Sequence, residues 1–227
     1  PMEERPEIDR WILSELNSLI KNVATDYEDY EPTKAGRLIQ QFVIDNLSNW
    51  HVRLSRKRFW GGGMNTDKLS AYQTLYTCLV TVAKLMAPIA PFYADNLFGD
   101  LIAVTVREHV ASVHLSDFPV CHEELIDKDL EERMQMAQSI SSMVLALRRK
   151  VNIKVRQPLQ HLMIPVLDEH QRSALEAVKA LVLNEVNVKE MRFVDNTEGI
   201  LVKKIKPDFK KLGPRYGKIM KALAAAI

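Results

Sequence analysis

A run of basic and aromatic side chains, from Asn46 to Trp60, is the part of this 227-residue sequence whose residue types most clearly indicate a chemistry. Within fifteen residues it holds four Lys or Arg and two Trp, and it holds no Asp or Glu. Cations neutralise phosphates and flat rings stack on unpaired bases, so this composition predicts a nucleic-acid surface. The candidate contacts are Asn49, Trp50, Arg53, Arg56, Lys57, Arg58 and Trp60.

The elements that position these side chains can be inferred from the apolar pattern. A helical pattern begins near Pro32, which suits a first helical turn, and continues to about Arg58. On an ideal α-helix Trp50 lies on the same face as three apolar residues of this pattern, Ile39, Val43 and Leu54. We therefore expect the Trp50 ring in the core or at its edge.

An adjacent stripe of the same helix has the composition of an RNA surface. At spacings of four, three and four it carries Asn49, Arg53, Arg56 and Trp60. An amide can read base edges, guanidiniums can bind phosphates or stack, and an indole can stack. The alternative is a solvated edge with an arginine ion-paired to the acid-rich N-terminal helix, and the pattern leaves both interpretations open.

Two further basic clusters follow, although the formal net charge is only +2. The first holds Arg148, Arg149, Lys150, Lys154 and Arg156, and the second lies in residues 203–221. Cations in the last turn of a helix also complement its dipole, so a purely structural role is open as well. The candidate contacts in these clusters are Lys154, Arg156, Lys203 and Lys204. Because strand side chains alternate, Lys203 and Lys204 are not both expected to face one ligand.

Catalytic signatures are missing from the sequence. It contains no GxxxxGK[ST] phosphate loop, no GxGxxG, no GxSxG and no HExxH. Its two cysteines, Cys78 and Cys121, have no CxxC spacing, so no metal site is expected, and Cys78 lies in an apolar helical pattern typical of core. No apolar run is long enough for a membrane span.

The pattern predicts a mainly α protein with a small α+β unit at its end. Helices are expected over about 9–26, 32–58, 66–86, 91–101 and 128–151, with either Thr66 or Asp67 capping the third. After Pro158 the apolar pattern changes. It predicts strands over about 161–166, 186–194 and 199–205, a helix over about 169–182, and a final basic helix. We therefore predict a helical bundle over 1–157 and an α+β unit, expected to be cut short, over 158–227.

Several segments together resemble one family. Asn46–Trp60 (NLSNWHVRLSRKRFW) resembles a helix of the anticodon-binding bundle of isoleucyl-tRNA synthetases, and Met86–Phe92 (MAPIAPF) resembles an element of the same bundle in class I synthetases. Ser112–Leu115 (SVHL) with Pro119, and Val155–Leu159 (VRQPL), are similar to the loop and the junction segment that follow in that family. The resemblance covers nearly the whole chain. The SVHL and SRKRFW runs favour the isoleucyl family over the related valyl and leucyl families.

The resemblance implies a tRNA-recognition region without its chemistry. The implied partner is an isoleucine-accepting tRNA, and the ligase reaction with ATP and Mg²⁺ would belong to a catalytic domain elsewhere in the parent. The chain itself is then expected to be inactive, without a cofactor, monomeric, cytoplasmic and without a membrane partner. The alternatives are the same domain of a valyl or leucyl synthetase, or a helical protein-interaction module.

Overall fold

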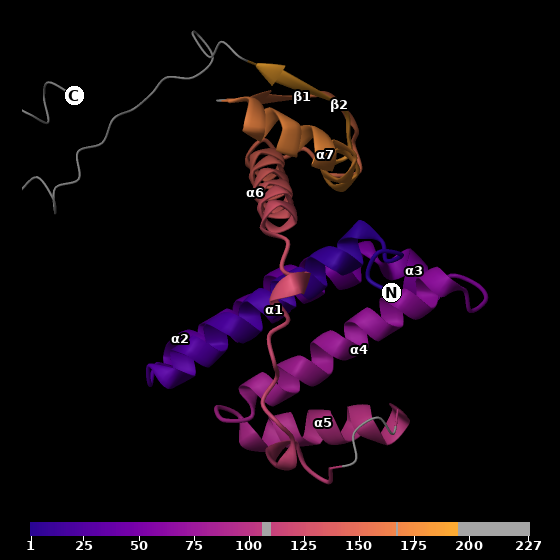
Figure 1. Cartoon of the computed structure of the whole chain (residues 1–227). Coiled ribbons are helices and arrows are strands. Elements are labelled where there is room, and N and C mark those ends of the chain that lie inside the picture. Colours follow the sequence, from indigo (N-terminus) through magenta and orange to yellow (C-terminus); the bar gives the residue numbers. More distant parts are fainter. Residues whose placement is uncertain (106–109, 167, 195–227) are drawn as a thin grey trace, which may run out of the picture. The chain divides into compact units, whose positions relative to one another are not determined.

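The computed structural model describes residues 1–105, 110–166 and 168–194. The chain forms two compact units, Pro1–Ile140 and Ser141–Ile227, which are described separately (Figure 1). The first unit is helical and the second combines helix and sheet, which confirms the predicted fold class. Within the described residues no helix is long and apolar enough to cross a membrane.

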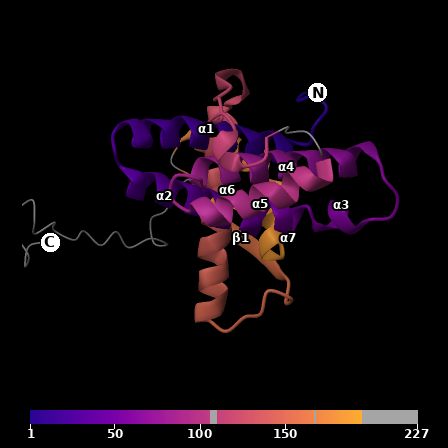
Figure 2. The same ribbon diagram turned by 90° about the horizontal axis from the view of Figure 1, so that it is seen from below.

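The first unit is a bundle whose long helices are α1, α4 and α5 (Figure 2). The amphipathic α1 packs against α2, η1 and α4, and α4 packs against α5. The buried face of α1 includes Ile12, Leu16, Leu19 and Val23, at the spacing of three and four that the sequence shows. Its elements are α1 (Glu7–Glu28), α2 (Pro32–Gln41), η1 (Phe42–Val52), α3 (Arg56–Trp60), α4 (Thr66–Met86), α5 (Pro91–Thr105), η2 (Val113–Leu115), η3 (Glu123–Leu125) and the first part of α6 (Lys128–Lys150).

The helix predicted from Pro32 to Arg58 is divided into α2, the π-helical η1 and the short α3, with a break at Ser55. In a π-helix the backbone hydrogen bonds join residues five apart instead of four, which widens the turn, and Phe42 and Leu47 are buried in η1. Trp50 is buried as predicted. Val43 and Leu54, which the sequence places on the same face, are half-buried.

The N-terminus of α4 also differs from its prediction. Asn65, and not Thr66 or Asp67, is the capping residue, and its Oδ1 accepts a hydrogen bond of 2.7 Å from the Lys68 backbone N–H. Asn is as good a cap as Ser or Asp because its short side chain reaches the free amides of the first turn. Cys78 lies in the core of α4 as predicted.

The second unit begins within α6 and contains β1 (Leu159–Pro165), α7 (Glu169–Val186) and β2 (Val188–Val194). The strands pair in parallel, with Leu159 opposite Val188 and Pro165 opposite Val194. Helix α7, which lies between the two strands in the sequence, buries Leu175, Val178, Val182 and Val186. The predicted domain boundary at residue 157 stays a prediction. The strand expected over 199–205 and the basic helix after it lie outside the described residues.

A half-buried carboxylate, that of Glu15, lies near the place where α1 and the start of α6 meet. Glu15 accepts hydrogen bonds of 3.2 Å from both Trp11 Nε1 and Asn46 Nδ2. Glu131 of α6 takes hydroxyl hydrogen bonds from two serines of α1, at 2.6 and 2.7 Å. Burial, and then repulsion from Glu131, raises the pKa of Glu15 from 4.5 to about 7.

The burial of Trp50 predicts a stability effect. Trp50→Ala should lower the free energy of unfolding by about 3–5 kcal/mol, because it leaves a cavity between η1 and the rest of the bundle. The neighbouring Arg53 is exposed, so Arg53→Ala should change stability by less than about 1 kcal/mol. Urea unfolding of both variants checks this, and a larger loss in Arg53→Ala would show that the assigned faces are reversed.

The raised pKa of Glu15 predicts a pH effect. Its pKa is higher in the folded state (about 7) than the ordinary 4.5, so ionisation opposes folding. This cost is absent below pH 4.5, grows up to pH 7 and is then complete, at about 3 kcal/mol or less. Glu15→Gln should therefore be more stable than the parent chain at about pH 8 but not at about pH 4. Denaturant titrations across this range measure the difference, and a constant difference would contradict the argument.

Candidate nucleic-acid interface

The N-terminal end of the bundle is organised around one buried carboxylate, that of Asp9 in α1. Its Oδ1 accepts hydrogen bonds from Arg58 Nη1 at 2.8 Å and from His51 Nε2 at 2.9 Å. Its Oδ2 accepts hydrogen bonds from Arg58 Nη2 and from Ser70 Oγ, both at 2.8 Å. Burial raises the pKa of the Asp9 carboxyl, but these hydrogen bonds outweigh burial and hold the pKa well below its usual range. One anion therefore joins α1, η1, α3 and α4.

Arg58 has no N–H group left for a ligand. Besides its fork onto Asp9, it donates Nε to Asp67 Oδ1 at 2.9 Å and Nη2 to the Asp67 carbonyl at 3.1 Å. A weaker bond of 3.3 Å runs from Nη1 to Ser55 Oγ. A guanidinium carries five N–H donors, and these five bonds use all of them. The hydrogen bonds to Asp9 also raise the pKa of Arg58 above its ordinary value.

An ion pair with the N-terminal helix is present, but Arg58 makes it, and Arg58 is not in the stripe for which the sequence left this alternative open. The sequence did not identify Asp9, His51 and Ser70 as its partners. A signal was present, because Asp9 lies three residues before Ile12 and seven before Leu16. It is an acid on the core face of an amphipathic helix, a position that requires a buried partner.

The other residues of the run lie at the surface. Asn49, Arg53, Arg56, Lys57 and Trp60 are all exposed. Arg53, directly after η1, donates its Nε to the Asn49 carbonyl at 2.7 Å, which places the two residues side by side. On α3 the Arg56 guanidinium lies 5.9 Å from the centre of the Trp60 ring, which is 78% exposed. We name these five residues the η1–α3 face; Trp50 and Arg58 are not part of it.

The end of α3 is fixed by a close backbone approach. A Cβ at Gly61 would lie 2.9 Å from the Lys57 carbonyl oxygen, so any larger residue would disturb the last turn of α3. The Gly61 carbonyl in turn accepts a hydrogen bond of 2.9 Å from Lys68 Nζ. These two contacts fix the backbone at Gly61, the residue that follows Trp60.

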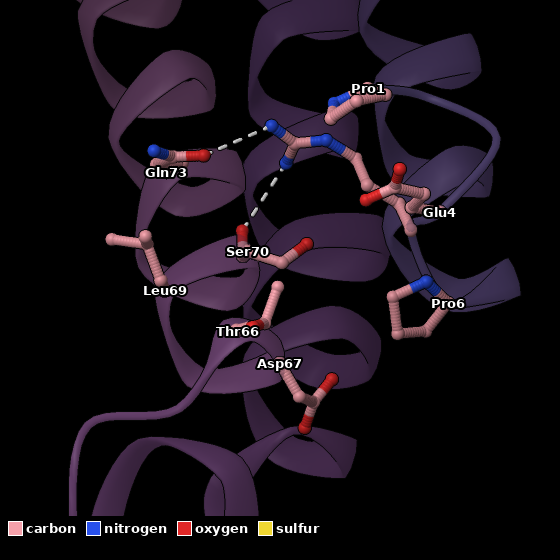
Figure 3. Close-up of a pocket in the computed structure, with 9 residues that line it drawn as sticks. Pro1, Glu4, Pro6, Thr66, Asp67, Leu69, Ser70 and Gln73 are labelled. Carbon is pink, nitrogen blue, oxygen red and sulfur yellow. Dashed lines mark hydrogen bonds between the residues drawn. The ribbon is translucent and has the colours of Figure 1, made fainter.

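A pocket of about 450 Å³ lies beside the Asp9 network, between the N-terminal segment and the start of α4 (Figure 3). Arg5 is one of the lining residues, and its guanidinium donates to the Ser70 carbonyl and to Gln73 Oε1, both at 3.3 Å. Its cation is thus bonded to α4, and the pocket is not a natural phosphate site. A second groove, of about 470 Å³, runs between α2, η1, α4 and α5, and its mostly apolar lining does not suit RNA.

In the second unit, the basic cluster at the end of α6 also consists of one buried arginine and of exposed basic residues. Arg148 is buried and donates to the carbonyls of Lys154 (3.2 Å), Gln157 (3.0 Å) and Asn187 (3.0 Å). Lys154 and Arg156 are exposed. Arg148 therefore holds the segment that displays the two candidate cations. Lys203 and Lys204 lie outside the described residues.

Within the part of the chain that the structure describes, no group of three or more His, Cys, Asp or Glu side chains could hold a metal ion. The arrangement in this part offers binding chemistry: exposed cations, an amide and a stacked indole.

The comparisons with known proteins agree with this arrangement. Residues 9–164 match the family described as the anticodon-binding domain of tRNA ligase. An isoleucine–tRNA ligase of Bacteroides fragilis is 72% identical over all 227 residues, which make up 20% of its length. The corresponding enzymes of Porphyromonas gingivalis and Thermus thermophilus are 66% and 37% identical over the whole chain. The chain spans about a fifth of the length of the curated relatives it matches.

The helical first unit, with its exposed basic and aromatic face, defines the class: a helical bundle of the kind that the matched family model describes. The chain belongs to the anticodon-binding domain family of tRNA ligases, in the form found in isoleucine–tRNA ligases. The resemblance read from the sequence is thereby confirmed.

The two arginines of α3 should differ in their effect on stability. Arg58→Gln leaves the buried Asp9 carboxylate without its main partner and should cost about 3–5 kcal/mol. Arg56→Gln, two residues earlier and exposed, should cost less than about 1 kcal/mol. Chemical denaturation of the two variants, which remove the same charge, compares them directly. Equal losses would mean that Arg58 is not the anchor of α3.

Proposed function

We propose that the chain recognises the anticodon arm of an isoleucine-accepting tRNA and that the η1–α3 face makes the contact. Arg53, Arg56 and Lys57 would neutralise phosphates of the arm. Asn49 and Trp60 would read and stack on its unpaired bases. Family membership supports tRNA as the partner, and the proposed contact residues are exposed on neighbouring turns of the first unit.

The observation that carries the proposal is the pairing of Arg56 with the exposed ring of Trp60. An indole exposed at the end of a helix leaves a ring face on which an unpaired base can stack. A cation beside that ring keeps phosphate near while a base stacks on the free ring face. Arg53 and Lys57 add positive charge, and no acid lies between Asn46 and Trp60 to oppose it.

Other parts of the function rest on family membership alone. In the second unit, Lys154 and Arg156 are proposed to hold phosphates too, since both are exposed. Isoleucine activation with ATP and Mg²⁺ is proposed to take place outside this chain. The monomeric state and the cytoplasmic location stay predictions, as does any contact by Lys203 and Lys204.

The proposal predicts a change in salt dependence. The triple variant Arg53→Gln, Arg56→Gln, Lys57→Gln should bind isoleucine tRNA more weakly, and the slope of log affinity against log salt should fall by about 0.7–0.9 for each phosphate that the variant no longer neutralises. Trp60→Ala should weaken binding by about 1–3 kcal/mol with an unchanged slope, because stacking releases no counterions. Titrations at several salt concentrations, with the full-length ligase, measure both effects.

The matched control removes the same charge elsewhere in the bundle. Lys21, Lys34 and Arg37 are exposed on α1 and α2, and their triple Gln variant should keep the parent slope. If both triple variants change the slope equally, the contact is non-specific attraction and the η1–α3 face is not the site. A tRNA with a foreign anticodon should bind more weakly than isoleucine tRNA; binding a protein partner but no tRNA would favour the interaction-module alternative.

A further inference from the structure

Helix α3 carries three of the five proposed contacts but is too short to hold its own position. It has five residues, it follows a break at Ser55, and the exposed glycines 61–63 come after it. Nucleating a helical turn is unfavourable, and isolated helices of this length are not stable in water. The position of Arg56, Lys57 and Trp60 must therefore come from contacts between α3 and the long helices.

Two side chains of α3 make those contacts. Phe59 is buried and lies edge-on to the Tyr72 ring of α4, with the ring centres 5.2 Å apart. Apolar contact of this kind is only weakly directional. Arg58 supplies direction, because its planar fork bonds Asp9 of α1 and Asp67 of α4 at fixed angles. Since Arg58 lies between Lys57 and Phe59 in one helical turn, fixing its fork also fixes the rotation of α3 about its axis.

We propose that Asp9 and Asp67 are positioning residues for tRNA binding: they hold Arg58, and through it they orient Arg56, Lys57 and Trp60 toward the RNA. This rests on the proposed function of the η1–α3 face. It assigns two carboxylates a supporting role in binding a polyanion. By charge alone, an acid near the binding face should weaken that binding.

Charge and positioning predict changes of tRNA affinity in opposite directions, so an experiment can distinguish them. Asp67→Ala removes a negative charge and the acceptor of Arg58 Nε, so electrostatics alone predicts tighter tRNA binding. Positioning predicts weaker binding, on the order of threefold or more, the scale of coupling within one hydrogen-bond network. The matched control is Asp29→Ala, an exposed acid at the other end of α1, which should bind as the parent does or slightly more tightly.

Asp67 is the main test because its side chain is 48% exposed and its loss leaves the buried ion pair in place. Asp9→Asn is the stricter variant. It is used only if its thermal transition shows a folded protein at the temperature of the binding experiment. Hydrogen exchange of the α3 amides in the full-length ligase should rise in Asp67→Ala and stay unchanged in Asp29→Ala.

A double-mutant cycle separates positioning from a general loss of folded protein. In a background that already carries Arg56→Gln, Lys57→Gln and Trp60→Ala, adding Asp67→Ala should cause no further weakening, because nothing is left on α3 to position. A loss of folded protein would weaken binding equally in both backgrounds.

The outcomes are distinguishable. If Asp67→Ala matches Asp29→Ala in affinity while the substitutions on α3 weaken binding, the positioning role is wrong and the proposed function stands. If the α3 substitutions themselves leave tRNA binding unchanged, the proposed face is wrong and the positioning role falls with it.

Discussion

The carboxylate of Asp9 is the constraint on which the N-terminal end of the bundle depends. An unpaired buried anion would cost several kcal/mol or would have to take up a proton. It is stable as an anion here because a guanidinium, an imidazole and a hydroxyl from three other elements all donate to it. The break at Ser55 and the short α3 make sense in this light, since they bring Arg58 onto α1.

The same division of roles recurs in both described basic clusters. In each, one arginine is nearly or fully enclosed and bonded to backbone or carboxylate oxygens, while the other basic residues of the cluster are exposed. Arg58 and Arg148 suit the enclosed role because a guanidinium spreads its charge over five donors in a plane. A lysine ammonium, compact and strongly hydrated, is costlier to enclose, and Lys57 and Lys154 lie outside. One arginine of each basic cluster therefore has a structural role.

Much of the fold followed from periodicity, because the apolar faces of α1 and α7 repeat at spacings that only a helix satisfies. The π-helical η1 did not follow in this way, because its wider turn, with hydrogen bonds between residues five apart, differs from the α-helical turn of 3.6 residues. Composition also found the basic face but could not separate Arg58 from Arg56. That separation depends on Asp9, which is 49 residues away in sequence and meets Arg58 only in the folded chain.

The arrangement also bears on how such a face could select one tRNA. Phosphate contacts give affinity and register but carry no base sequence, so Arg53, Arg56 and Lys57 alone would accept any anticodon arm. Selection needs groups that meet bases, and on the proposed face these are Asn49 and Trp60. They lie on different elements, η1 and α3, and the contacts that hold α3 on α1 and α4 fix their separation. Base selection would then be as sensitive to the buried ion pair as to the residues that touch the RNA.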